Sequence, residues 1–183
     1  QYQKCANVFQ VKGSANEFLQ AVSITLMDDV NVPYTVKVYT NLADSGKPTS
    51  GILAAKVSGK TSYAGTYTIP LGKSVSLPKG SFYSVVVELD KQDSGISMEA
   101  SGSDQYVSCK ISMECNQSFV YRNGEWADLT DVVPMDHFGN LCIKGYTQKE
   151  SSSIAKAETP KASGITKNSV KLSDYKAKKM DLV

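Results

Sequence analysis

Nucleophilic chemistry in this chain would have to come from four cysteines and a single histidine, His137. A cysteine peptidase needs a thiolate beside an imidazole, and a third group that orients the ring. The catalytic cysteine of such an enzyme lies at a Gly- and Ser-rich helix start, before a bulky aromatic residue. None of the four cysteines has that context, and no Gly-x-Ser-x-Gly elbow is present for a serine nucleophile. The sequence therefore predicts a domain without catalytic activity of its own.

The single tryptophan stands beside a turn, among residues that suit sugar binding. A sugar site needs an exposed ring for the CH face of the sugar and polar side chains for its hydroxyls. Trp126 has Tyr121 and Arg122 before the turn and Asp128 after it. These four residues are our candidate ligand site. The alternative is that Trp126 packs over the hairpin as a cross-strand contact.

Acidic residues gather at predicted turns, where they are candidates for calcium binding. Calcium takes six to eight oxygen ligands, so two or three carboxylates with loop carbonyls suffice. The candidate ligands of one structural calcium are Asp28, Asp29, Asp90 and Asp93. No EF-hand spacing is present, and the alternative is that these acids are solvated turn residues. No other cofactor is expected.

The elements that must position these residues are predicted to be β-strands. Apolar and polar residues alternate with a period of two over residues 18–26, 34–39, 82–89 and 107–115. In 18–26 the even-numbered residues are the more apolar, and in 107–115 the alternation predicts that Cys109 and Cys115 are buried. No window of a dozen residues shows a comparable helical pattern.

Turn residues separate these segments at the spacing of a β-sandwich. The strongest signal is the pair Asn123 and Gly124, because a two-residue hairpin turn needs positive φ at both positions. We expect about nine to eleven strands, as is typical of a sandwich. The prediction is an all-β fold over residues 5–148: an antiparallel two-sheet β-sandwich of the jelly-roll type, like a carbohydrate-binding module.

Composition and charge exclude several classes of protein. With 41% apolar and 21% charged residues, the chain is not mostly disordered, and its longest uncharged apolar run, 82–87, is too short to span a bilayer. Residues 1–148 hold 12 Lys and Arg against 14 Asp and Glu, whereas residues 149–183 hold 8 Lys against 4 acids. Nucleic-acid binding is not expected, because basic residues exceed acidic ones only in a Ser/Ala/Thr-rich tail.

The tail is predicted to be a basic linker. Residues 162–173 resemble the opening strands of a fibronectin type III domain, although Asp174 and Tyr175 stand where its usual tryptophan would fall. No apolar signal stretch opens the chain. We therefore expect a piece of a longer protein that ends a little way into a truncated fibronectin-like module.

A series of short motifs resembles a known family. The motifs, in chain order, are residues 6–9, 19–24, 33–42, 48–51, 63–71, 82–88, 117–119, 124–126, Leu129 and 139–143. Over residues 5–148 they resemble the lectin-like domain that follows the catalytic domain in certain secreted papain-type cysteine peptidases of Gram-positive gut bacteria. Glu99 stands where this family tends to have glutamate, and we expect a structural polar contact there.

The resemblance implies a jelly-roll sandwich at the cell surface or secreted, with a peptidase domain upstream. It implies a non-catalytic accessory module whose partner is either cell-wall or host carbohydrate, or the neighbouring peptidase domain. Both alternatives stay open, and no membrane insertion is expected.

The cysteines allow more than one pairing. Cys109 and Cys115 would lie about 20 Å apart on a straight strand, whereas a disulfide needs Cα atoms within about 7 Å. Cys5 and Cys142 lie near the two ends of the domain, where terminal strands of a sandwich often pair, so a bridge between them is one alternative. Four free thiols, which suit an anaerobic secretion route, are the favoured alternative.

Overall fold

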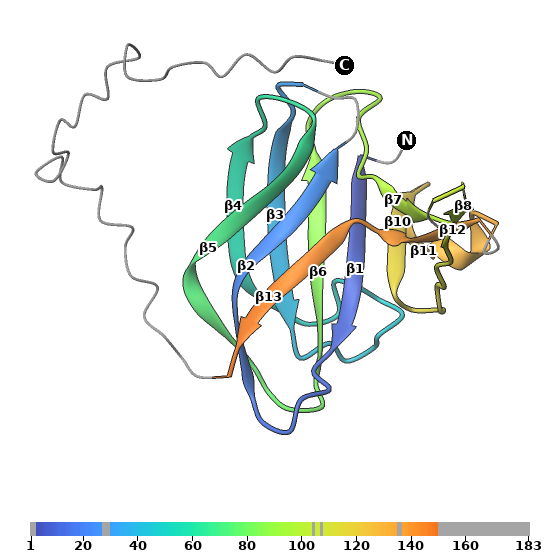
Figure 1. The fold of residues 1–183 in the computed structure, drawn as a ribbon. Coiled ribbons are helices and arrows are strands. Elements are labelled where there is room, and N and C mark those ends of the chain that lie inside the picture. Colours follow the sequence, from blue (N-terminus) through green and yellow to red (C-terminus); the bar gives the residue numbers. More distant parts are fainter. Residues whose placement is uncertain (1–2, 27–29, 104, 107, 135–136, 150–183) are drawn as a thin grey trace, which may run out of the picture.

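Six antiparallel strands form the larger sheet of the domain, in the spatial order β11-β10-β1-β6-β3-β4 (Figure 1). The computed structural model describes residues 3–26, 30–103, 105–106, 108–134 and 137–149. The strands of this sheet are β1 (Lys4–Gln10), β3 (Pro33–Thr40), β4 (Ile52–Lys60), β6 (Phe82–Leu89), β10 (Ser118–Arg122) and β11 (Glu125–Asp128).

A three-stranded antiparallel sheet packs face to face against the first (Figure 1). Its strands are, in spatial order, β13 (Ile143–Gln148), β2 (Glu17–Leu26) and β5 (Gly65–Leu77). Beside these layers lie two small pairs, β7 (Met98–Ala100) with β12 (Phe138–Leu141), and β8 (Gly102–Ser103) with β9 (Ser108–Cys109). The prediction of an all-β antiparallel sandwich is confirmed.

Helical structure in the described residues is limited to one 3-10 turn, η1 (Leu129–Asp131). None of the described helical segments is long and apolar enough to cross a membrane. The described residues form thirteen strands, more than the nine to eleven expected, because β7, β8 and β9, with only two or three residues each, are counted among them.

The core lies between the two sheets and follows the predicted alternation in the central strands. Val36 and Val38 of β3 are fully buried, as are Val85 and Val87 of β6. The opposite face of the larger sheet has a smaller apolar cluster, and Tyr39, Leu42, Phe82 and Trp126 pack against it. The buried members of this outer cluster are Ala6, Val8, Val86 and Phe119.

In β2 the expected phase holds at one end only. Val22, Ile24 and Leu26 are fully buried as expected, but near the start of the strand Leu19 is fully buried and Phe18 only half-buried. The pairing with β5 shifts register between Leu19 and Ala21. A bulge inserts extra residues into one strand, so the side chains before it exchange faces.

The strand expected over 107–115 is largely wrong. Only Ser108 and Cys109 form a strand there, and Val107 lies outside the described residues. Cys109 and Cys115 are exposed, whereas Met113 is buried. An alternating pattern makes a strand only where a neighbouring strand pairs with it, and residues 110–115 have no such pairing in the structure.

The hairpin predicted at Asn123 and Gly124 is confirmed. Both residues have positive φ, 52° and 88°, and they join β10 to β11. Tyr121 pairs with Trp126, and Phe119 pairs with Asp128. This register determines which of the candidate sugar-binding residues share a face.

Candidate functional site

The rings of Tyr121 and Trp126 meet edge to face, with their centroids 5.2 Å apart. Lys4 Nζ lies 4.3 Å from the Tyr121 centroid and 5.4 Å from that of Trp126. Trp126 is half-buried over the outer cluster, and its Nε1 donates to Thr49 Oγ1 at 3.4 Å. The tryptophan therefore already packs and hydrogen-bonds within the domain, as the cross-strand alternative expects.

The other two predicted ligand residues, Arg122 and Asp128, lie outside the pair formed by the Tyr121 and Trp126 rings. Arg122 is exposed at the hairpin end, and as the neighbour of Tyr121 along the strand it faces the opposite side of the sheet. Asp128 is the N-cap of η1, and its carboxylate accepts from Thr130 N at 2.9 Å and from Asn116 N at 2.5 Å. Asp128 thus holds the chain after the hairpin, and ligand binding by this group of residues stays a prediction.

The structure describes two of the four calcium candidates. Asp90 and Asp93 are exposed, and Asp28 and Asp29 lie outside the described residues. Among the residues that the structure describes, no three His, Cys, Asp or Glu side chains gather to hold a metal. Two described carboxylates do not by themselves meet the coordination that calcium needs, so calcium binding stays a prediction.

All four cysteines are free thiols, which is the favoured alternative of the sequence analysis. Cys5 is buried, and burial raises the pKa of its thiol to about 12. Burial also raises the pKa of Cys142, which is half-buried, and the nearby Glu99 carboxylate adds to this effect. A thiol with a raised pKa is a poor nucleophile at neutral pH, because little thiolate is present.

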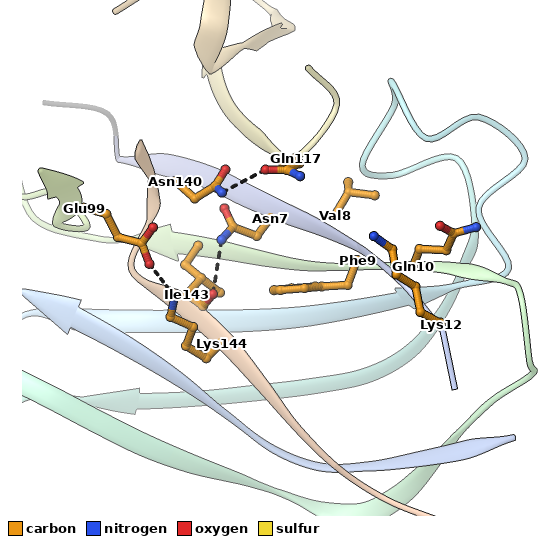
Figure 2. Close-up of a pocket in the computed structure, with 10 residues that line it drawn as sticks. All are labelled: Asn7, Val8, Phe9, Gln10, Lys12, Glu99, Gln117, Asn140, Ile143 and Lys144. Carbon is orange, nitrogen blue, oxygen red and sulfur yellow. Dashed lines mark hydrogen bonds and ion pairs between the residues drawn. The ribbon is translucent and has the colours of Figure 1, made fainter. Parts of the chain in front are cut away.

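A pocket of about 280 Å³ opens between β1 and β13, beside β7 and β12 (Figure 2). Glu99 and Lys144 lie at one end and Gln10 and Lys12 at the other, with the Phe9 ring between them (Figure 2). The lining residues are Asn7, Val8, Phe9, Gln10, Lys12, Glu99, Gln117, Asn140, Ile143 and Lys144.

A buried amide network fixes one wall of this pocket. Asn7 Nδ2 donates to the carbonyl oxygens of Leu141 and Ile143 at 2.9 and 3.1 Å. The Ser118 hydroxyl lies 2.8 Å from both Asn7 Oδ1 and Asn140 Oδ1, and its single proton serves one of them at a time. Asn140 Nδ2 donates to Gln117 Oε1 at 2.9 Å. The polar wall is therefore organised before any ligand arrives.

The pocket also has an apolar surface. Phe9 is half-buried and stacks on Tyr83, with centroids 5.1 Å apart and an interplanar angle of 22°. Tyr83 is itself buried, so the Phe9 ring is held in place from one side. An aromatic ring beside fixed amides is an arrangement suited to a ligand with both CH groups and hydroxyls.

At the end of the pocket away from Gln10 and Lys12, Lys144 Nζ and Glu99 Oε1 form an ion pair at 2.5 Å. A Cβ atom at Gly139 would lie 2.7 Å from Ile111 Cδ1 and 3.1 Å from Glu99 Cβ, so any larger residue would displace the Ile111 side chain and crowd Glu99. The ion pair with Lys144 is the structural polar contact that we expect of Glu99 from the sequence.

Residues 1–147 match the family model of a lectin-like domain. The chain belongs to the lectin-like domain family. The matched family model describes a lectin-like domain and not a catalytic domain. Comparison with curated protein sequences finds none that matches.

Two solved structures resemble this lectin-like domain. One contains the cysteine protease and lectin-like domains of Cwp84, a surface-layer-associated protein of Clostridium difficile, with 25% identity and a TM-score of 0.60. The other, a clostridial Cwp84 variant after propeptide cleavage, has 24% identity and a TM-score of 0.62. Both matches cover 80% of this chain but only 32% and 36% of the Cwp84 chains.

Sequence reasoning did not assemble the pocket of this lectin-like domain. Its polar residues come from separate segments, and each alone resembles an ordinary surface amide. A signal was nevertheless present, because Asn7, Phe9, Gln117 and Asn140 all lie within the motifs that resemble the family.

Proposed function

We propose that this lectin-like domain is a non-catalytic accessory module of a secreted, surface-associated cysteine peptidase, and that it binds a saccharide in the Figure 2 pocket. One observation supports saccharide binding above all others. The Phe9 ring lies beside the Asn140 amide, which the buried Ser118 hydroxyl contacts, and the Gln117 amide, which accepts from Asn140. The ring offers a surface for sugar CH groups, and the amides supply donors and acceptors for hydroxyls.

The hydrogen-bond network gives the ligand a defined acceptor. When the Ser118 proton is donated to Asn7 Oδ1, Asn140 Oδ1 is left to accept from a ligand hydroxyl. Asn140 Nδ2 donates to Gln117 Oε1 at 2.9 Å, so both amides are already ordered before a ligand binds. Preorganised groups lose less conformational entropy when a ligand binds.

The setting is proposed from the relative. Cwp84 has a cysteine protease domain and is associated with a surface layer, and we extend the peptidase partner and the surface location to this chain. A binding module that is tethered to a peptidase raises the local concentration of substrate without changing the active site.

The proposal is tested by titrating the full chain with saccharides selected on a glycan array. We expect Gln117→Ala and Asn140→Ala each to weaken binding by about tenfold, because a hydrogen bond is worth about 1 kcal/mol or more. Trp126→Ala tests the alternative site at the hairpin. It should lower the unfolding stability by about 2 kcal/mol, less than a fully buried tryptophan would, and leave the affinity unchanged.

Two outcomes would contradict saccharide binding in this pocket. The first is the absence of any bound glycan for the parent chain. The second is a folded Trp126→Ala protein that alone loses binding, which would move the site to the hairpin with Tyr121, Arg122 and Asp128.

Docking against the neighbouring peptidase domain is the second candidate function. It is favoured by the edge strand β4, where Ile52 and Leu53 are 66% and 50% exposed. Adjacent exposed aliphatic residues on an edge strand are typical of a contact surface. If no glycan binds, a loss of peptidase association in the Ile52→Lys variant would support docking.

A further inference from the structure

The edge of β1 is open along the pocket. β6 pairs with the whole of β1, but β10 pairs only with Cys5, Ala6 and Asn7. Beyond these residues, the Val8 N–H donates to the Gln117 carbonyl at 2.8 Å, and no strand continues next to Gln10.

The pairing of β1 with β6 determines where the backbone N–H of Gln10 points. The Val11 N–H donates to the Ser81 carbonyl at 2.9 Å, so odd-numbered residues of this stretch direct their backbone groups toward the β6 side. Backbone groups alternate along a strand, so the Gln10 N–H points away from β6, on the side where Gln117 contacts Val8. Among the described residues, none accepts a hydrogen bond from it.

The charges around the pocket are unequal at its two ends. Lys144 is neutralised by Glu99 at 2.5 Å. Lys12, which is exposed, forms no ion pair with any described carboxylate. The pocket therefore has one net positive charge at the end next to Gln10, although residues 1–148 as a whole have a net charge of −2.

We infer that the saccharide bound in this pocket is an acidic one, and that its carboxylate lies at the Gln10 and Lys12 end. This inference rests on the proposed function. A carboxylate accepts hydrogen bonds from the Gln10 backbone N–H and from Lys12 Nζ, and charge-assisted hydrogen bonds of this kind are stronger than neutral ones. The sugar ring lies over Phe9, and its hydroxyls contact Gln117 and Asn140.

The opposite end of the pocket sets the orientation. A ligand carboxylate bound to Lys144 would lie next to the Glu99 carboxylate, and the two negative charges would repel each other. The acid group is therefore directed toward Lys12. A neutral sugar has no carboxylate to form charge-assisted hydrogen bonds at the Gln10 and Lys12 end, so the difference in affinity between acidic and neutral sugars measures the charge effect of this end.

The test uses matched pairs of oligosaccharides on the full chain. Each pair consists of a glycan that ends in a uronic or sialic acid and the same glycan with its carboxyl group reduced to an alcohol. We expect the acidic members to bind about tenfold more tightly at low salt, and the difference to shrink as salt screens the charges.

Variants locate the effect. Lys12→Gln should abolish the preference for the acidic member, and Lys12→Arg should retain it. Lys73→Gln, which removes an exposed lysine outside the pocket, is the control and should change neither affinity. Unfolding midpoints of all three variants that equal the midpoint of the parent chain would show that the fold is intact.

The possible failures separate the two proposals. If both members of a pair bind equally, the acidic preference is wrong and saccharide binding in the pocket stands. If no oligosaccharide of either kind binds, both proposals are wrong.

Discussion

Glu88 is held between two lysines on the outer face of the larger sheet. Its carboxylate lies 2.7 Å from Lys37 Nζ and 3.3 Å from Lys4 Nζ. Burial raises the pKa of Glu88, but hydrogen bonds and charge attraction from Lys37 and Lys4 outweigh it, and the net pKa is lowered. The same Lys4 lies over the Tyr121 ring, so one lysine connects the hairpin to this acid.

The lowered pKa predicts a dependence of stability on pH. A carboxyl group whose pKa is lower in the folded state stabilises the fold above its ordinary pKa of about 4.3 and loses this effect as the pH falls through the folded value. Glu88→Gln should therefore flatten the loss of stability below about pH 5, measured by urea unfolding from pH 7 to 3. Because the Glu88 side chain is 31% exposed, we expect no more than about 1 kcal/mol. An unchanged pH profile in the variant would contradict the ion-pair assignment.

At the scale of the elements, the chain passes from one sheet to another between β12 and β13. β12 pairs with β7, whereas β13 pairs with β2, and only Cys142 separates them. Asn7 of β1 bonds the carbonyls on both sides of this junction, and its side chain is almost fully buried. One amide thus joins β1 to the strands that form the opposite wall of the pocket.

Replacing this amide with a similar-sized apolar side chain tests its role in the junction. Asn7→Leu should lower the free energy of unfolding by about 2–3 kcal/mol, because it leaves buried carbonyls without a donor. Gln10→Ala, on the same strand but exposed, is the control and should change it by less than about 0.5 kcal/mol. Denaturant unfolding measures both. Equal stabilities of the Asn7→Leu variant and the parent would show that the junction does not depend on Asn7.

At the scale of the whole molecule, the buried apolar residues of the described core run from Cys5 to Ile143. The last strand ends at Gln148, close to the predicted domain boundary. We therefore propose that residues 149–183 add little to the stability of the sandwich. A chain that ends at Gln148 should have the thermal unfolding midpoint of the full chain to within about 2 °C, since it keeps every buried apolar residue of the described core. A fall of several degrees in calorimetry would show that the basic tail contributes to the fold.

The sequence by itself determined those parts of the sandwich in which the residue pattern of a segment agrees with the pairing of that segment in the sheet. The alternation in β3 and β6 predicts which valines face the core between the sheets, because each of these strands has a partner on both sides that fixes its two faces. The hairpin at Asn123 and Gly124 is equally local, because positive φ at two positions is decided by residue type.

The tertiary structure decided what depends on partners far along the chain. The same alternation over 107–115 gives almost no strand, since no neighbour pairs with it, and the bulge in β2 reverses the faces of Phe18 and Leu19. The pocket exists only because β1, β7, β12, β13 and the segment before β10 meet at one end of the sandwich. Its lining mixes apolar and polar residues from these separate segments, so no periodicity along the sequence distinguishes them. Their chemistry arises from the distances between segments, which the packing of the two sheets sets.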